Sequence, residues 1–117
     1  PKWPEIIGNY YVTDGYMELI ESNADLNKDT YNRAEHIVPL SVIVSKLKEF
    51  ANPSIEEIEE VLIQNLHYAT ISKEEDMQLK KLGLNSKMPD EYYDPTHPLY
   101  NDIFARYKVA NINIFKK

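Results

Sequence analysis

The sequence predicts a small, mostly helical α+β domain with an N-terminal β-hairpin, a strand–strand–helix core and an inserted helical pair. Three observations predict this class. The length of 117 residues suits a single domain, 1–117. Segments with helical spacing of apolar residues alternate with short segments rich in strand formers. Two capping boxes, one beginning at Ser54 and one at Ser72, mark the starts of helices.

Composition excludes several classes of protein. The chain has no cysteine, which excludes disulfides, a cysteine-ligated zinc site and a thiol nucleophile. We see no apolar run of membrane-spanning length and no signal-peptide pattern, and we expect a cytoplasmic protein. The net charge of −6 argues against a surface that is basic all over. Residues 72–117 carry eight basic and seven acidic side chains, so a face that meets phosphate is expected there.

The first predicted element is a β-hairpin over residues 6–20. Residues 10–12 and 16–20 are rich in strand formers, and Asp14-Gly15 between them is a strong turn signal. Residues 21–30 are polar and predict a loop. A short strand then ends at Glu35-His36.

Two helices are expected next. The first has a stripe of apolar residues at helical spacing and ends near Asn52-Pro53; the stripe comprises Leu40, Ile43, Val44, Leu47 and Phe50. Ser54 and Glu57 form a capping box that begins the second. That helix is expected to bury Ile55, Ile58, Val61 and Leu62. Its glutamates at 56, 57, 59 and 60 are typical of a solvated outer face.

The segment after Gln64 is ambiguous. Either the helix continues to Ala69, or residues 67–71 form a short strand, which Tyr68, Thr70 and Ile71 favour slightly. Ser72 and Glu75 form the second capping box, whose helix ends near Leu82-Gly83. Residues 85–98 predict an irregular connection, in which Tyr92 and Tyr93 cover the core. Pro98 is expected to open a last helix with one shared face: Tyr100, Ile103, Phe104 and Tyr107.

Glu35 and His36 are the first candidate functional residues. Neighbouring residues on a strand point to opposite faces, so the two side chains suit different tasks, one holding a metal and one moving a proton. A site for phosphodiester cleavage needs a hard divalent cation on oxygen or nitrogen ligands, a histidine that takes a proton from water, and a group that orients this histidine. The simpler alternative is a strand-end histidine that packs or hydrogen-bonds locally.

The residues that follow extend this pattern. Glu35-His36-Ile37-Val38-Pro39-Leu40-Ser41, then Asn65-Leu66, then Lys73-Glu74-Glu75-Asp76, resembles the HNH nucleases of the ββα-metal fold over residues 33–83, with 40–63 as a helical insertion. The resemblance implies that Glu35 and Asp76 ligate the metal, that His36 is the general base and that Asn65 orients its imidazole. It also implies an enzyme that cuts nucleic acid, with DNA as the first expectation. The later Gly83-Leu84, Lys87-Met88-Pro89 and Arg106-Tyr107 are similar to phage-type members of the family. Oxygen ligands favour Mg²⁺ or Mn²⁺ over Zn²⁺.

Basic side chains in the C-terminal part are candidate phosphate contacts: Lys73, Lys80, Lys81, Lys87 and Arg106. His67 joins them, because on a strand it would share a face with Asn65. Solvated lysines and a packed histidine are the alternatives. The predicted function is metal-dependent hydrolysis of nucleic acid. Two alternatives stay open: a nuclease-like protein that only binds, and a non-catalytic module in which residues 40–82 form three packed helices with an acidic outer face.

Overall fold

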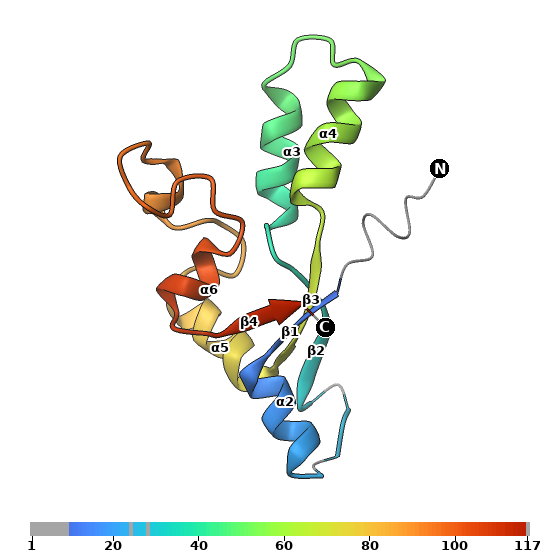
Figure 1. Ribbon diagram of the computed structural model, residues 1–117, viewed down its shortest axis with the longest axis vertical. Coiled ribbons are helices and arrows are strands. Elements are labelled where there is room, and N and C mark those ends of the chain that lie inside the picture. The colour runs from blue at the N-terminus through green and yellow to red at the C-terminus, as the bar shows by residue number, and fades with distance from the viewer. Residues whose placement is uncertain (1–9, 24, 28, 117) are drawn as a thin grey trace.

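The computed structural model describes residues 10–116 except 24 and 28, and shows a small α+β domain built on a mixed four-stranded sheet (Figure 1). The strands lie in the order β2-β3-β1-β4. They are β1 (Tyr10–Thr13), β2 (Tyr31–His36), β3 (Tyr68–Ser72) and β4 (Ile114–Lys116). β2 is antiparallel to β3, β3 is parallel to β1, and β1 is antiparallel to β4.

Five α-helices accompany this sheet within the described residues. They are α2 (Asp14–Glu21), α3 (Leu40–Lys48), α4 (Ile55–Asn65), α5 (Lys73–Lys81) and α6 (Ala105–Val109), with a 3₁₀ turn η1 (Asp90–Tyr93). α3 and α4 lie side by side and project beyond one end of the sheet, whereas α2 lies at the opposite end (Figure 1). None of the helices described here combines the length and apolar character needed to cross a bilayer.

The predicted N-terminal hairpin is wrong over its described part, and residues 6–9 lie outside the described residues. Asp14 and Gly15 open α2 instead of forming a turn between strands. The cause is the hydroxyl of Thr13, which accepts a hydrogen bond from the backbone N–H of Tyr16 and caps the helix. The partners of β1 are therefore distant in sequence, β3 and β4.

The inserted helical pair is confirmed, and so is the capping box of Ser54 with Glu57. Its predicted buried stripes are only partly right. In α3 the buried residues are Val42 and Ile43, whereas Leu40 and Val44 are exposed. In α4 Ile55 is exposed, whereas Val61 and Leu62 are partly buried and pack against the core, as do Leu47 and Leu66.

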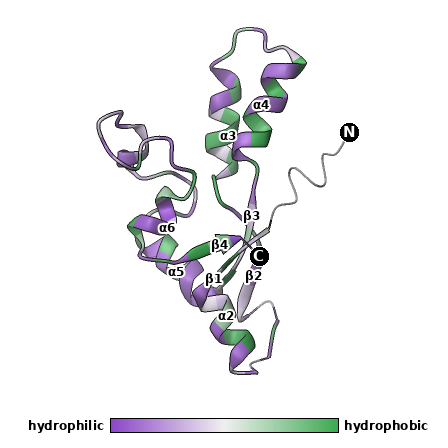
Figure 2. Cartoon of the chain, viewed as in Figure 1, coloured by the Kyte–Doolittle hydropathy of each residue, from purple (hydrophilic) through white to green (hydrophobic). Residues whose placement is uncertain are grey.

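The ambiguous segment after Gln64 is a strand. Because β3 separates α4 from α5, the prediction of three packed helices over residues 40–82 is wrong. The second capping box, Ser72 with Glu75, begins α5, and Gly83 follows its end with a positive φ of 74°, as expected for a C-terminal stop. α5 is hydrophilic over most of its length (Figure 2). It buries only Asp76 and Leu79.

The C-terminal third departs more from expectation. Pro98 does not open a helix, because residues through Phe104 form turns and α6 begins only at Ala105. Tyr92 is buried as predicted, whereas Tyr93 is 58% exposed. The last strand, β4, was not predicted.

Two clusters of buried residues form the core. The first lies between the sheet and α5 with α6, and comprises Ile37, Ala69, Ile71, Leu79, Leu84, Tyr107, Ala110 and Ile112. The second lies beneath the helical pair, and comprises Val38, Val42, Ile43, Met88, Tyr92 and Ala105. The chain segment that leaves β2 contributes adjacent residues to the two clusters. The candidate site lies at that point.

Candidate functional site

A β-bulge in β2 prepares the site. Asn32 pairs with Ile71 and Glu35 pairs with Ala69, so between these pairs β2 has two residues where β3 has one. The extra residue brings Asn32 and Glu35 to the same face of the sheet, where regular alternation would separate them. The Asn32 Nδ2 donates a hydrogen bond to Glu35 Oε2 at 3.0 Å. The bulge therefore aims the Glu35 carboxylate and supplies it with a neighbour.

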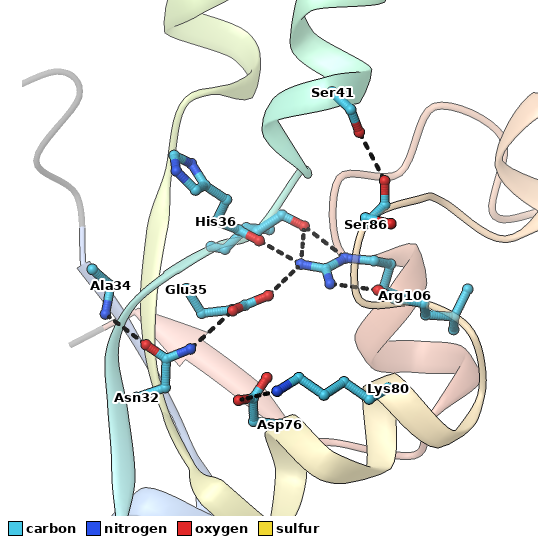
Figure 3. Close-up of polar contacts among 11 residues, drawn as sticks. Asn32, Ala34, Glu35, His36, Ser41, Asp76, Lys80, Ser86 and Arg106 are labelled. Carbon is cyan, nitrogen blue, oxygen red and sulfur yellow. Dashed lines mark hydrogen bonds and ion pairs between the residues drawn. The ribbon is translucent and has the colours of Figure 1, made fainter. Parts of the chain in front are cut away.

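The Glu35 carboxylate lies between a cation and a second carboxylate (Figure 3). Its Oε1 accepts a hydrogen bond from Arg106 Nη2 at 3.2 Å, and its side chain is 15% exposed. Burial raises the pKa of Glu35, the Arg106 guanidinium opposes this rise, and the nearby charge of Asp76 adds to it. Asp76, on α5, is itself buried and lies 3.7 Å from Lys80 Nζ. Glu35 and Asp76, both predicted as metal ligands, thus lie on different elements, and their charges interact.

Arg106 is fully buried, so it does not lie on a surface where it would contact phosphate. Its guanidinium donates to the carbonyls that end β2 and to the loop after α5. Nε and Nη2 bond to the carbonyl of Ile37 at 3.3 and 3.0 Å, Nη2 also bonds to that of His36, and Nη1 bonds to that of Leu84 at 2.7 Å. The predicted phosphate contact is instead an internal clamp.

The imidazole of His36 lies on the side of β2 opposite Glu35 and points away from Arg106 (Figure 3). It packs on Tyr68 with 4.9 Å between ring centroids. Its Nδ1 is buried and has no hydrogen-bond partner among the residues that the structure describes. Glu35 and His36 nevertheless line the same pocket, of about 250 Å³. Its other lining residues are Ala34, Pro39, Leu40, Ser41, Asn85 and Ser86.

The prediction required Asn65 to lie on a strand and face His36, and the structure contradicts this. Asn65 is the last residue of α4, and its Nδ2 donates back to the Val61 carbonyl at 2.8 Å. It lines a different pocket, of about 320 Å³, with Lys46, Gln64, Tyr92, Asn101 and Ile103. The structure therefore gives His36 no orienting contact from Asn65.

His67 precedes β3 and is buried instead of presenting a surface contact. Its ring meets that of Tyr11 edge to face, with 6.1 Å between centroids. This geometry matches the packed histidine that was the alternative for this position.

The predicted lysines lie on and just beyond α5. Lys80, Lys81 and Lys87 are exposed, and Lys73 is partly buried at the start of the helix. The three exposed lysines are accessible to a ligand. Asn32 was missed, because the bulge that turns it toward Glu35 leaves no recognisable signal in the sequence.

The donor set fits a hard divalent cation held by few protein ligands. No group of three or more His, Cys, Asp or Glu side chains suited to a metal occurs among the described residues. Mg²⁺ is commonly bound through one or two carboxylates, with water and substrate phosphate completing its shell. Glu35 and Asp76 meet that lower requirement. Comparisons with protein-family models, curated proteins and solved structures gave no match for this chain.

Proposed function

We propose that this chain is a nuclease of the HNH type, which hydrolyses phosphodiester bonds in nucleic acid, DNA in the first instance, with a divalent metal ion. One observation carries the proposal. Strand β2 carries Glu35 and pairs antiparallel with β3, which leads directly into α5, so Glu35 and Asp76 lie near enough for their charges to interact. The resemblance of residues 33–83 to HNH nucleases assigns metal ligation to the same two positions.

In this proposal Glu35 and Asp76 hold Mg²⁺ or Mn²⁺. The ion, when bound, neutralises charge on the phosphate and on the leaving oxygen. Asn32 and Arg106 hold the Glu35 carboxylate through one bond to each oxygen, which leaves further lone pairs on both oxygens for a metal. The exposed lysines of α5 contact the phosphates on either side.

His36 takes the proton from the attacking water. Its imidazole has to turn from Tyr68 toward the pocket that it lines with Glu35, so a rotamer change is part of the proposal. The unpartnered Nδ1 supports this, because turning the ring costs no hydrogen bond from that atom. Asn65 has no part in orienting the ring, since its amide is bonded to Val61.

A plasmid-nicking assay tests the proposal, with Mg²⁺ or Mn²⁺ and with EDTA added in parallel, and with a single-stranded RNA as a second substrate. We expect cleavage that EDTA abolishes. His36→Ala should lower the rate by roughly 10²–10⁴, the usual contribution of a general base. His97→Ala is the matched control, because His97 Nδ1 accepts its own chain's Leu99 N–H at 3.0 Å, in the turns after η1. A folded His36→Ala variant as fast as the parent would contradict the mechanism.

A nuclease-like protein that binds without cleaving is the second candidate. It is favoured by the cations that already accompany both carboxylates, Arg106 on Glu35 and Lys80 on Asp76. The same assay separates the two functions. Retention of DNA in a filter-binding experiment, with an affinity that falls steeply as salt rises, and no nicking at any metal concentration would favour the binder.

A further inference from the structure

Arg106 differs from the predicted lysine contacts because its side chain is fully buried. It is the largest fully buried side chain in the described part of the protein. Burying a charge is costly unless that charge is paired and hydrogen-bonded. Arg106 meets this requirement with five hydrogen bonds to four acceptors: the carboxylate of Glu35 and the carbonyls of His36, Ile37 and Leu84.

The position of Arg106 in the core is also particular. Its neighbours in sequence belong to different clusters, since Ala105 packs beneath the helical pair and Tyr107 packs against the sheet. Across from it, Ile37 and Val38 divide between the same two clusters in the same way. The guanidinium therefore lies where the two clusters meet, bonded to the end of β2.

We propose that Arg106 is a positioning residue of the candidate site, which fixes the Glu35 carboxylate and the backbone of His36 relative to α5 and α6. The inference rests on the proposed function. Three segments meet at the guanidinium: the end of β2 through His36 and Ile37, the loop after α5 through Leu84, and α6, which carries Arg106 itself.

The planar guanidinium is suited to this task in a way that lysine is not. It presents donors in a rigid fork, and here all three nitrogens are used. One of them, Nη2, bonds to Glu35 Oε1 and to the His36 carbonyl together. A displacement of Arg106 thus moves the predicted metal ligand and the backbone of the predicted base at once. Groups that hold metal ligands in this way are worth about 10–100-fold in metal affinity or activity.

The test compares the Mn²⁺ affinity of the 117-residue chain with those of Arg106→Met and Arg106→Lys, by electron paramagnetic resonance at a low temperature at which circular dichroism shows each variant to be folded. We expect each folded variant to bind Mn²⁺ about 10–100-fold more weakly. The lysine variant keeps the charge and loses the fork, so a loss there identifies geometry as the cause. Lys108→Met is the matched control: Lys108 lies on the same helix, is exposed and pairs with Asp102. It should bind as the parent does.

A merely structural role would lower the melting temperature and leave the Mn²⁺ affinity of the folded molecules unchanged. An affinity within about twofold of the parent in either folded variant overturns the inference and leaves the proposed function standing. Failure of both variants to fold would assign Arg106 to the fold alone, and would overturn it too. A parent chain that binds no Mn²⁺ overturns the proposed function together with this inference.

Discussion

Replacing Arg106 by methionine removes a buried cation while keeping much of its volume. Four acceptors lose a donor: the Glu35 carboxylate and the carbonyls of His36, Ile37 and Leu84. Breaking a buried ion pair from one side costs about 3–5 kcal/mol. Because the unfolding free energy of small domains is about 5–15 kcal/mol, the variant should still fold, with a much lower unfolding free energy than the parent.

A second substitution separates the orphaned charge from the lost hydrogen bonds. In the Arg106→Met background, Glu35→Gln replaces a carboxylate that has lost its cation by a neutral amide of the same shape. The double variant should regain about 1–2 kcal/mol of unfolding free energy over Arg106→Met, within the usual size of couplings between contacting residues. Glu35→Gln alone should change stability by less than about 1 kcal/mol, because three backbone carbonyls still solvate Arg106.

Urea unfolding at pH 7, followed by circular dichroism, measures all four chains. The control cycle uses Lys108→Met and Asp102→Asn, whose lysine is 55% exposed, so its coupling should stay below about 1 kcal/mol. The reasoning is refuted if Arg106→Met costs less than about 1 kcal/mol. It is also refuted if the double variant is no more stable than Arg106→Met.

Three further predictions concern other parts of the chain. A Cβ on Gly15 would lie 2.5 Å from the carboxyl carbon of Glu75, whose carboxylate accepts hydrogen bonds from the backbone of both Gly15 and Ser72. Gly15→Ala should therefore displace this carboxylate and lower the unfolding free energy by about 1–3 kcal/mol. An unchanged midpoint in urea unfolding would contradict this. Ser54→Ala removes the cap of α4 and should cost about 1 kcal/mol in a thermal melt. Burial raises the pKa of Glu35 above 4.5, so the native state holds this proton more tightly than the unfolded chain does. The difference in unfolding free energy between the parent and Glu35→Gln should therefore fall as the pH rises from about 4.5 through the raised pKa of Glu35. A difference that does not change with pH would contradict this prediction.

Local signals in the sequence predicted the elements they belong to. The two capping boxes and Gly83 place helix ends correctly, because each box needs only a side chain three residues away and Gly83 itself adopts the positive φ of a C-terminal stop. The prediction of an N-terminal hairpin was wrong because another local side-chain signal decides this segment. Asp14-Gly15 suits a turn, but Thr13 in front of it also suits a helix cap, and the pairing of β1 with the distant β3 leaves the cap as the local solution.

The candidate site shows the limit of such signals more sharply. Glu35 and Asp76 were predicted as partners from motifs on two separate short elements, and the charge of Asp76 contributes to the raised pKa of Glu35. Arg106 was predicted on the surface, since a lone arginine in a basic region carries no sign that four acceptors up to 71 positions away surround it. Asn65 was placed on a strand that begins three residues later, which removed its predicted contact with His36.

The charges at the candidate site predict that metal binding and nucleic-acid binding strengthen each other. Two carboxylates, Glu35 and Asp76, face two cations, Arg106 and Lys80, so a divalent ion enters a nearly neutral site. Arg106 is buried and stays, whereas Lys80 is 59% exposed and free to leave Asp76 for a phosphate. Nucleic acid should therefore tighten Mn²⁺ binding, and by reciprocity Mn²⁺ should tighten nucleic-acid binding by the same factor.

Lys80→Met isolates this effect. Without its competing cation, Asp76 should bind Mn²⁺ about fivefold more tightly in the absence of nucleic acid, since an exposed pair is worth up to about 1 kcal/mol. The same variant should lose much of the tightening that a phosphorothioate duplex, which resists cleavage, gives the parent. Lys81→Met, one residue along and without an ion pair to Asp76, is the control. Equal Mn²⁺ affinity in the parent and in Lys80→Met would show that Lys80 does not compete for Asp76, and the coupling between metal and phosphate would then need another cause.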